Sequence, residues 1–333
     1  MDRFRVVLVD HEWDSLAIEQ KMFLQQTETP IEFLYIPSRT EEELITATAD
    51  ADAVLVLYAK MNRQVITQMK RCKIISRYGV GVDMIDVEAA TEKGIYVANV
   101  PDYGIDEVSD HVLAFILAQS RRLFAYHSHV AQGGWDFKSV DIPVRASKTR
   151  VGLIGFGNIA RRLAKKLLSI GYQVCSYDPY VPDQTMRASG VASVSLEELL
   201  QTSDYISIHV PLVKETRHLI SFSEFAIMKR SAFLINAARG PIVDENALLD
   251  ALNKKQIAGA ALDVTETEPL PEHHPLRRMP NVVITPHAAW YSEDALVEIR
   301  RKACQNIIDF MKMGKPTYLV NSHLAMMQGN DKN

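Results

Sequence analysis

Short apolar runs alternate with polar, helix-like stretches along the first hundred residues. The runs are rich in β-branched residues and are bounded by turn formers, which is typical of buried parallel strands. We expect strands at residues 5–9, 33–36, 53–57, 73–76 and 95–97, and helices at 41–48 and 87–93. Strands that alternate with helices in this way predict a parallel sheet covered by helices on both faces.

A second alternating series begins at Val151. Its apolar runs predict six strands, at residues 151–154, 173–177, 205–208, 232–235, 258–262 and 282–285. Long helical patterns flank the series, from Asp106 to about Tyr126 and from Ser292 to about Met313. We therefore predict two doubly wound α/β domains bridged by these helices. One domain, residues 101–289, is inserted into the other, residues 1–100 and 290–333.

Composition narrows the class of protein. The chain has 333 residues, 47% of them hydrophobic, which suffices for two cores of ordinary size. Its 37 basic and 41 acidic residues give a net charge of −4, which argues against a nucleic-acid or anionic-membrane surface. No apolar run approaches the roughly 18 residues of a membrane span. The cysteines, Cys72, Cys175 and Cys304, are odd in number and far apart, so we expect a cytoplasmic protein without disulfides.

A glycine-rich turn follows the strand predicted at residues 151–154. Its sequence is Gly155-Phe-Gly157-Asn-Ile-Ala160. Gly155 permits the tight turn from strand to helix, Gly157 lets a pyrophosphate approach the backbone, and Ala160 allows close helix–strand packing. A strand before this motif and an amphipathic helix after it favour a dinucleotide site over a purely structural turn.

The residues around this turn indicate which dinucleotide binds. The amides of Asn158 and Ile159 are expected to point at the phosphates from a helix N-terminus. Asp178 lies 21 residues after Gly157, at the end of the next strand, where a carboxylate accepts hydrogen bonds from ribose hydroxyls. An acid there repels a 2′-phosphate, so the sequence favours NAD over NADP. The alternative is that Asp178 only caps a helix.

Arg239 follows the strand predicted at residues 232–235. The carboxyl ends of parallel strands face the ligand crevice of such folds. A guanidinium there can hold a carboxylate through two parallel hydrogen bonds and polarise the adjacent carbonyl group. The alternative is a surface arginine paired with an acid such as Asp244.

His287 follows the last predicted strand and is a candidate acid and base. An imidazole with an unperturbed pKa of about 6.5 can exchange a proton with an alcohol near neutrality. Glu268 is expected to fix its tautomer and favour its protonated form, with Glu266 as the rival partner. The neighbouring pair His273 and His274 is interpreted as solvated surface, and no metal site is expected.

Together these segments resemble the D-isomer-specific 2-hydroxyacid dehydrogenase family, over residues 5–320. The matching segments are Tyr78–Asp83, Gly155–Ala160, Asn236–Gly240, Asp263–Pro269 and Thr285–His287. The resemblance implies an NAD-dependent oxidoreductase that transfers a hydride between nicotinamide and C2 of a small 2-oxo or 2-hydroxy acid. It assigns substrate binding to Arg239, orientation of the histidine to Glu268, and proton transfer to His287.

The resemblance also implies a Rossmann NAD-binding domain inserted into a flavodoxin-like substrate domain, and a homodimer built mainly on the NAD-binding domain. Asp263 would hold the nicotinamide carboxamide, and the Val80 and Gly81 amides would contact the substrate carboxylate. The further residues expected along the cofactor are Val210, Thr216 and Ala237.

Two features depart from most of the family. Trp290, soon after His287, resembles the C-terminal-binding-protein branch of NAD-sensing corepressors, where the matching tryptophan lines the substrate pocket; alternatively it only packs at the domain hinge. The chain also resembles the core of D-3-phosphoglycerate dehydrogenases without an appended regulatory domain. The alternative functions are therefore D-3-phosphoglycerate dehydrogenase proper, an NAD(H)-sensing corepressor-like protein, and a dehydrogenase of formate or phosphite.

Overall fold

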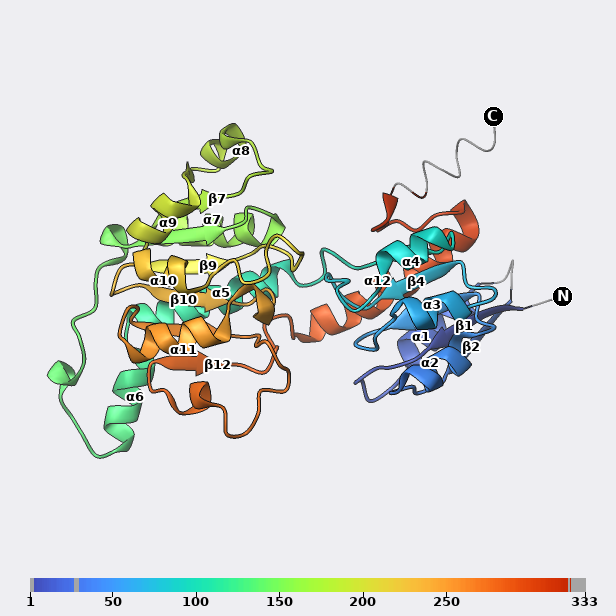
Figure 1. Ribbon diagram of the computed structural model, residues 1–333, viewed down its shortest axis with the longest axis horizontal. Coiled ribbons are helices and arrows are strands. Elements are labelled where there is room, and N and C mark those ends of the chain that lie inside the picture. The colour runs from blue at the N-terminus through green and yellow to red at the C-terminus, as the bar shows by residue number, and fades with distance from the viewer. Residues whose placement is uncertain (1–2, 27–29, 323, 325–333) are drawn as a thin grey trace. The chain divides into compact units, whose positions relative to one another are not determined.

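The protein divides into two compact units (Figure 1). The computed structural model describes residues 3–26, 30–322 and 324. The first unit combines Met1–Tyr103 with Ser292–Asn333, and the second is Gly104–Tyr291. These boundaries differ by only a few residues from the predicted ones, and they assign Trp290 to the second unit.

The first unit contains a five-stranded parallel sheet in the order β2-β1-β3-β4-β5. The strands are β1 (Phe4–Leu8), β2 (Ile31–Tyr35), β3 (Ala53–Val56), β4 (Ile74–Arg77) and β5 (Tyr96–Ala98). The helices of this unit are α1 (Ala17–Leu24), α2 (Glu41–Thr48), α3 (Arg63–Gln68), α4 (Val87–Glu92) and α12 (Glu293–Met313). The five strands expected from the sequence are thus confirmed.

Helix α12 returns the chain to this first sheet. The hydroxyl of Ser76 on β4 donates to the carbonyl oxygen of Ala303 on α12, at 2.9 Å. Arg300 of α12 forms a buried ion pair with Glu19 of α1, with Nε 2.7 Å from Oε1. A buried charge needs such a partner, so the pair fixes which faces of α1 and α12 meet.

The second unit contains a seven-stranded parallel sheet in the order β12-β11-β10-β9-β6-β7-β8. The strands are β6 (Arg150–Ile154), β7 (Gln173–Tyr177), β8 (Ala192–Ser193), β9 (Tyr205–Ile208), β10 (Phe233–Asn236), β11 (Gly259–Leu262) and β12 (Val282–Ile284). Six were expected, and the seventh, β8, is only 2 residues long and carries no alternating pattern.

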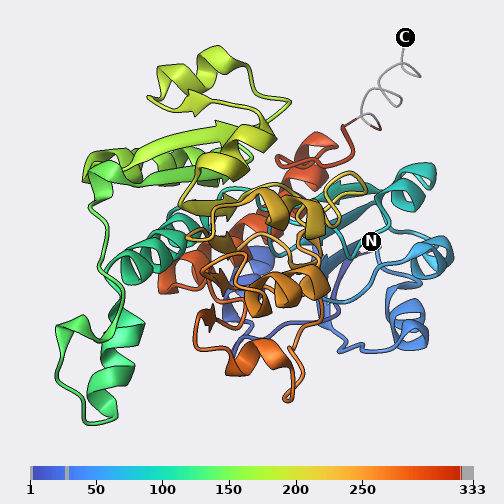
Figure 2. The ribbon, with the colours of Figure 1, turned by 60° about the vertical axis from the view of Figure 1, so that its left-hand side comes forward.

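Helices cover both faces of the seven-stranded sheet (Figure 2). Helices α9 (Leu196–Thr202), α10 (Phe222–Ile227) and α11 (Glu245–Asn253) share one apolar cluster with strand residues such as Ile206. Helices α5 (Ile105–Ser120), α7 (Asn158–Ile170) and α8 (Asp183–Ala188) share the other with residues such as Tyr205. Neighbouring strand residues thus face opposite clusters, as the period of two requires.

The helix predicted from Asp106 to about Tyr126 is wrong as a single element. Helix α5 ends at Ser120, and a separate helix, α6, runs over Leu123–Ala131. Between them Arg122 has φ of 56°, in the left-handed region, which a continuous α-helix cannot contain. Apolar spacing persists across this break, so periodicity alone did not reveal it.

The polar, Met-rich sequence after Val320 predicts a poorly ordered tail, but its first residue is held in place. Asn321 is buried, and its side chain accepts a hydrogen bond from the Val97 amide and donates to Thr91 and to the carbonyl oxygen of Ile95. These bonds tie the segment to the edge strand β5. Residues 325–333, also part of the predicted tail, lie outside the described residues.

Two predictions from the sequence concern the cysteines and membrane-spanning segments, and the structure bears on both. Cys72, Cys175 and Cys304 are all buried free thiols. Within residues 3–26, 30–322 and 324, none of the helices combines the length and apolar character that crossing a bilayer requires.

Candidate active site

Three of the predicted site residues follow three neighbouring strands. Arg239 comes after β10, Glu268 after β11 and His287 after β12, and β10, β11 and β12 are consecutive in the second sheet. All three strands are parallel, so these side chains belong to loops at the same edge of the sheet.

His287 and Glu268 form a direct pair. Nδ1 of His287 lies 2.7 Å from Oε2 of Glu268, and both side chains are about one-third exposed, at 33% and 39%. The second carboxylate oxygen of Glu268 accepts a hydrogen bond from the Thr265 amide at 3.1 Å. The rival, Glu266, lies 2.8 Å from His218 instead. Nε2 of His287 is left as the atom that can exchange a proton with a ligand.

The carboxyl group of Glu268 is held in its ionised form. Burial alone would raise its pKa, but the hydrogen bond to His287, the His287 charge, the Thr265 amide and the Arg239 charge lower it more, so its pKa lies below the ordinary 4.5. An ionised Glu268 can only accept, so Nδ1 of His287 donates to it, and this bond orients the ring.

Arg239 lies in a turn shaped by a buried asparagine. Asn236 accepts a hydrogen bond from the Ala238 amide at 3.0 Å and donates one to the carbonyl oxygen of Arg239 at 2.9 Å. Nη1 of Arg239 donates to the carbonyl oxygen of Ala238. Asp244, the alternative partner, instead caps α11 and accepts a hydrogen bond from Ser221.

Asp263 holds the turn that carries His287. Its carboxylate accepts hydrogen bonds from the Thr285 hydroxyl at 2.5 Å and from the amides of Ala288 and Ala289, each at 2.9 Å. Its carbonyl oxygen accepts the amide of His287 at 2.8 Å. His287 has φ of 54°, a left-handed conformation that costs on the order of 1 kcal/mol and needs such support. The Asp263 side chain is only 2% exposed, so positioning this turn is the role its contacts establish.

His111 on α5 also belongs to this site, although nothing in its sequence context singles it out. Its Nε2 atom lies 3.0 Å from the Thr285 hydroxyl, and the ring packs edge-on against Phe115. The imidazole therefore extends the network around Asp263 to the helix that covers the sheet. The only signal was a polar residue near the buried face of an apolar helix.

The glycine-rich turn has the geometry of a phosphate site. Gly155 has φ of 95°, which L-amino-acid side chains rarely adopt, and Val210 and the His209 backbone press against it. Gly157 is exposed, with open space where a side chain would be. No side chain of the described residues caps α7, whose first residues are Asn158 and Ile159. Its free N–H groups therefore fit the pyrophosphate of a dinucleotide.

Asp178 lies at the end of β7, beside this turn. Its carboxylate accepts hydrogen bonds from the Phe156 amide at 2.8 Å and the Tyr180 amide at 2.9 Å. A cavity of about 460 Å³ adjoins it. The cavity is lined by Asp178 and by Tyr177, Pro179, Tyr180, Val181, Pro182, Asp183, Ser193 and Val194. Its position suits the adenosine half of the dinucleotide.

The other predicted cofactor contacts come from loops at the same edge. Val210 follows β9 and touches Gly155, and Ala237 directly follows β10. The Thr216 hydroxyl accepts the Val213 amide and donates to the carbonyl oxygen of Pro211, so it shapes its own loop.

Val80 and Gly81, the predicted substrate-contacting amides, belong to the first unit. The Val80 side chain is exposed, and its carbonyl oxygen accepts a hydrogen bond from Asn99 at 2.7 Å. In the second unit, Trp290 is half-buried, packs edge-on against Tyr291, and approaches Gly104 at the start of α5.

His274 differs from the solvated surface residue that the sequence suggested. Its side chain is only 20% exposed, and Nε2 lies 3.5 Å from a carboxylate oxygen of Glu245. Such contacts cannot be predicted from the sequence of a Pro-rich segment, because its side chains follow no helical or strand period. Over the part of the chain that the structure describes, no three histidine, cysteine or acidic side chains are grouped as metal ligands.

The fold and site define a class of protein. The profile of the D-isomer specific 2-hydroxyacid dehydrogenase NAD binding domain matches residues 113–289. The chain belongs to this family of NAD-dependent oxidoreductases, which act on the CH–OH group of 2-hydroxyacids. The matched profile describes an NAD binding domain.

Individual relatives carry more specific names. A D-3-phosphoglycerate dehydrogenase of Methanocaldococcus jannaschii is 41% identical over 77% of this chain and 49% of its own length. A glyoxylate reductase of Thermofilum pendens is 39% identical over 89% of this chain and 88% of its own. The crystal structure of an Aquifex aeolicus D-lactate dehydrogenase complexed with NAD and lactic acid is 29% identical, covers 94% of this chain and 98% of its own, and has a TM-score of 0.81. The chain thus spans about half the length of the first relative and most of the other two.

Proposed function

We propose that this protein is an NAD-dependent D-2-hydroxyacid dehydrogenase that reduces small 2-oxoacids. The observation that carries the proposal is the 2.7 Å pair of His287 and Glu268, on the strand edge that also bears Arg239 and the glycine-rich turn. An acid, its orienting carboxylate and a carboxylate-binding cation beside a dinucleotide site are what reduction of a 2-oxoacid needs.

In the proposed mechanism, Arg239 binds the substrate carboxylate and polarises the carbonyl group at C2. His287, with Nδ1 bonded to Glu268, gives a proton from Nε2 to the oxygen that becomes the hydroxyl group. Asp263 keeps the His287 turn in place during this transfer. The nicotinamide, when bound, supplies the hydride. The reverse reaction uses the same residues, with His287 as the base.

The cofactor would be held by the residues of the glycine-rich turn and the neighbouring loops. The α7 amides of Asn158 and Ile159 suit the pyrophosphate, and the Asp178 carboxylate suits the ribose hydroxyls. Val210, Thr216 and Ala237 are proposed to line the rest of the cofactor site. Binding of the substrate carboxylate by the amides of Val80 and Gly81 stays a prediction.

The substrate is proposed to be a small 2-oxoacid such as glyoxylate or hydroxypyruvate. The glyoxylate reductase relative, matched along 88% of its length, favours this size class. A spectrophotometric assay of NADH oxidation would be run with glyoxylate, hydroxypyruvate, phosphohydroxypyruvate, pyruvate and branched 2-oxoacids, and each would be repeated with NADPH. Turnover of at least one unphosphorylated 2-oxoacid with NADH supports the proposal, and chiral analysis of the product should give the D isomer.

The same assay separates the alternatives. Selectivity for phosphohydroxypyruvate over hydroxypyruvate would indicate a D-3-phosphoglycerate dehydrogenase, the activity named for relatives that this chain matches over about half of their length. Tight NADH binding without turnover of any substrate would indicate an NAD(H)-sensing binding protein. Reduction of NAD by formate or phosphite would indicate a dehydrogenase of those donors.

We further propose a cytoplasmic homodimer that binds no nucleic acid. Helix α6 and the segment after it expose large apolar side chains, including Phe124, Trp135, Phe137 and Ile142. Burying such a patch against a second copy is favourable. Light scattering should give twice the 37.5 kDa chain mass, and Trp135→Glu should yield the monomer. The buried free thiols are compatible with a reducing compartment.

A further inference from the structure

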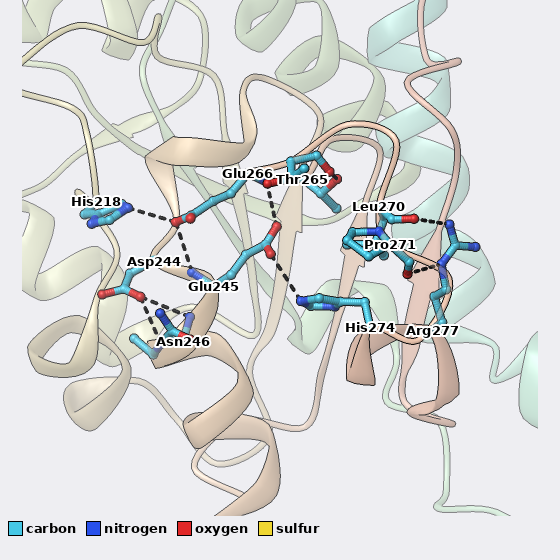
Figure 3. Close-up of polar contacts among 12 residues, drawn as sticks. His218, Asp244, Glu245, Asn246, Thr265, Glu266, Leu270, Pro271, His274 and Arg277 are labelled. Atoms are coloured by element: carbon cyan, nitrogen blue, oxygen red, sulfur yellow. Dashed lines mark hydrogen bonds and ion pairs between the residues drawn. The ribbon is translucent and has the colours of Figure 1, made fainter.

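Two glutamates beside the candidate active site bind each other's backbone (Figure 3). Glu245 is the first residue of α11, and Glu266 lies in the loop after β11. The Glu266 amide donates to Oε1 of Glu245 at 2.6 Å, and the Glu245 amide donates to Oε1 of Glu266 at 3.3 Å. We call this reciprocal pair the Glu245–Glu266 clasp.

Two histidines lie against the two carboxylates of the clasp. Nε2 of His218 lies 2.8 Å from Glu266, and Nε2 of His274 lies 3.5 Å from Glu245 (Figure 3). The N-terminus of α11 adds its partial positive charge to the same place. The helix end and the ring N–H of His218, which can donate to the Glu266 carboxylate, both favour the clasp.

The clasp connects three loops at the carboxyl edge of the sheet. His218, in the loop after β9, has φ of 53°, and its amide donates to the carbonyl oxygen of Pro241 in the loop after β10. Its ring reaches Glu266 in the loop after β11. A left-handed backbone at a non-glycine residue persists only where its surroundings hold it, as these contacts do.

The connected loops carry the proposed catalytic groups. The segment that begins at Arg239 leads to Glu245, one residue of the clasp. The other residue of the clasp, Glu266, lies two residues before Glu268. Between them Gly240 packs against Thr265, whose amide binds the Glu268 carboxylate. The order of contacts is therefore Glu245 to Glu266, then along the backbone to Thr265, and then to Glu268 and His287.

The far end of the same loop is anchored separately. Arg277 donates from Nε to the carbonyl oxygen of Pro271 at 3.0 Å and from Nη2 to that of Leu270 at 2.5 Å (Figure 3). The loop that bears Glu268 is thus held at both ends, by the clasp before Glu268 and by Arg277 after it. Loss of the clasp would free only the end nearer to Thr265.

We propose that Glu245 and Glu266 are positioning residues, which hold the loop that bears Glu268 against the loop that bears Arg239. The inference rests on the proposed function for its kinetic consequence, and on the contacts alone for its structural one. Both bonds of the clasp need an acceptor oxygen rather than a charge, so glutamine should replace glutamate and alanine should not.

Hydrogen exchange tests the structural part without any turnover. Wild type, Glu245→Ala, Glu245→Gln and an exposed control in the same loop, Glu272→Ala, would be compared by mass spectrometry at single-amide resolution. We expect Glu245→Ala to speed exchange at least tenfold at the amides of both Glu266 and Thr265, and Glu245→Gln to restore most of the protection. Faster exchange at Glu266 alone would mean that the clasp does not position Glu268, and would overturn the proposal.

Kinetics test the functional part. With a 2-oxoacid that the wild type reduces, Glu245→Ala and Glu266→Ala should each lower kcat about tenfold or more, since small displacements of catalytic groups are costly. The dissociation constant for NADH, measured by fluorescence, should stay within about twofold of wild type. The double variant should lose little more than either single one, because one clasp is broken in each.

The possible failures are distinguishable. If both alanine variants keep wild-type kcat while only their melting temperatures fall, the clasp is merely structural and the inference is wrong. If the wild type itself turns over no 2-oxoacid, the proposed function fails, and the exchange rates at Thr265 still decide whether the clasp positions Glu268.

Discussion

The backbone of Gly240 packs directly against the carbonyl group of Thr265, with no room for a Cβ atom between them. The two residues belong to the loops that carry Arg239 and Glu268. Their close approach therefore contributes to the spacing of the proposed substrate-binding cation and the carboxylate that orients His287.

Substituting Gly240 should damage stability and activity together. Gly240→Ala forces the two loops apart, and overpacking of this kind costs about 1–3 kcal/mol in the free energy of unfolding. Urea denaturation measures that loss, and kcat should fall as well. Gly104→Ala is the control, because the nearest atom to its new Cβ would be at an ordinary 3.5 Å. Equal stability of the two variants would contradict the close packing.

Removing the proposed acid should abolish most turnover while the fold remains. His287→Gln is expected to lower kcat by a factor of about 10² to 10⁴. Glu268→Gln should lower it less, because the imidazole remains but its tautomer and charge are less well supported. Steady-state assays with circular dichroism check both, and His127→Gln, on the exposed side of α6, is the control. Wild-type rates for His287→Gln would remove His287 from the mechanism.

Arg239→Lys should act mainly on substrate binding. A lysine keeps the charge but loses the planar pair of donors that matches a carboxylate, so KM for the 2-oxoacid should rise about tenfold or more. Arg230→Lys, at an exposed position nearby in sequence, should leave KM unchanged. If both variants behave like wild type, Arg239 does not bind the carboxylate.

Asp178 should set the preference for NADH over NADPH. Asp178→Ser removes the negative charge that repels a 2′-phosphate, and the ratio of kcat/KM for NADPH to that for NADH should rise at least tenfold. The Phe156 and Tyr180 amides lose their acceptor as well, so KM for NADH should also rise. Asp183→Asn, which lines the same cavity, is the matched control. An unchanged ratio would show that Asp178 does not select the cofactor.

The Glu268–His287 pair should survive mild acid. The pKa of Glu268 in the folded protein lies below the ordinary 4.5, so its contribution to stability is complete above that value and is lost only as the pH falls through the lowered pKa. Carbon-13 NMR of labelled glutamate should show titration of this carboxyl group below pH 4.5. In His287→Gln the titration should move upward, because the hydrogen bond and charge that lower the pKa are gone. Titration above 4.5 in the wild type would contradict the pairing.

Much of the fold could be predicted from the sequence because most of its strands are buried on both faces. Such strands are continuous apolar runs. Among the residues that the structure describes, eleven of the twelve strands follow from these runs; β8 has only 2 residues and no run to detect. The break between α5 and α6 was missed since Arg122 is not a residue that marks left-handed turns. The local hydrophobic pattern indicates which residues are buried, but it does not indicate their backbone dihedral angles.

The candidate active site could likewise be predicted only in part from the sequence. Arg239 and His287 could be singled out because each follows a strand, and strand ends determine which loops share an edge. Glu268 and Glu266 follow the same strand, and only the family resemblance favoured Glu268. The contacts of Glu245, His274 and His111 could not, because they depend on loop conformations that bring together residues without a common period. The part played by Asp263 in holding the His287 turn also required the structure, since a buried aspartate after a strand has many possible partners.

Neighbouring parallel strands lie about 4.8 Å apart, a separation dictated by peptide geometry and insensitive to side-chain identity. Cation, carboxylate and imidazole lie in the loops that follow β10, β11 and β12, so the ladder of main-chain hydrogen bonds sets the spacing of the points from which these loops start. Residues elsewhere that determine which substrate binds can therefore be substituted without changing this spacing. An engineer seeking a new substrate should leave these three strand termini intact and diversify the surrounding segments.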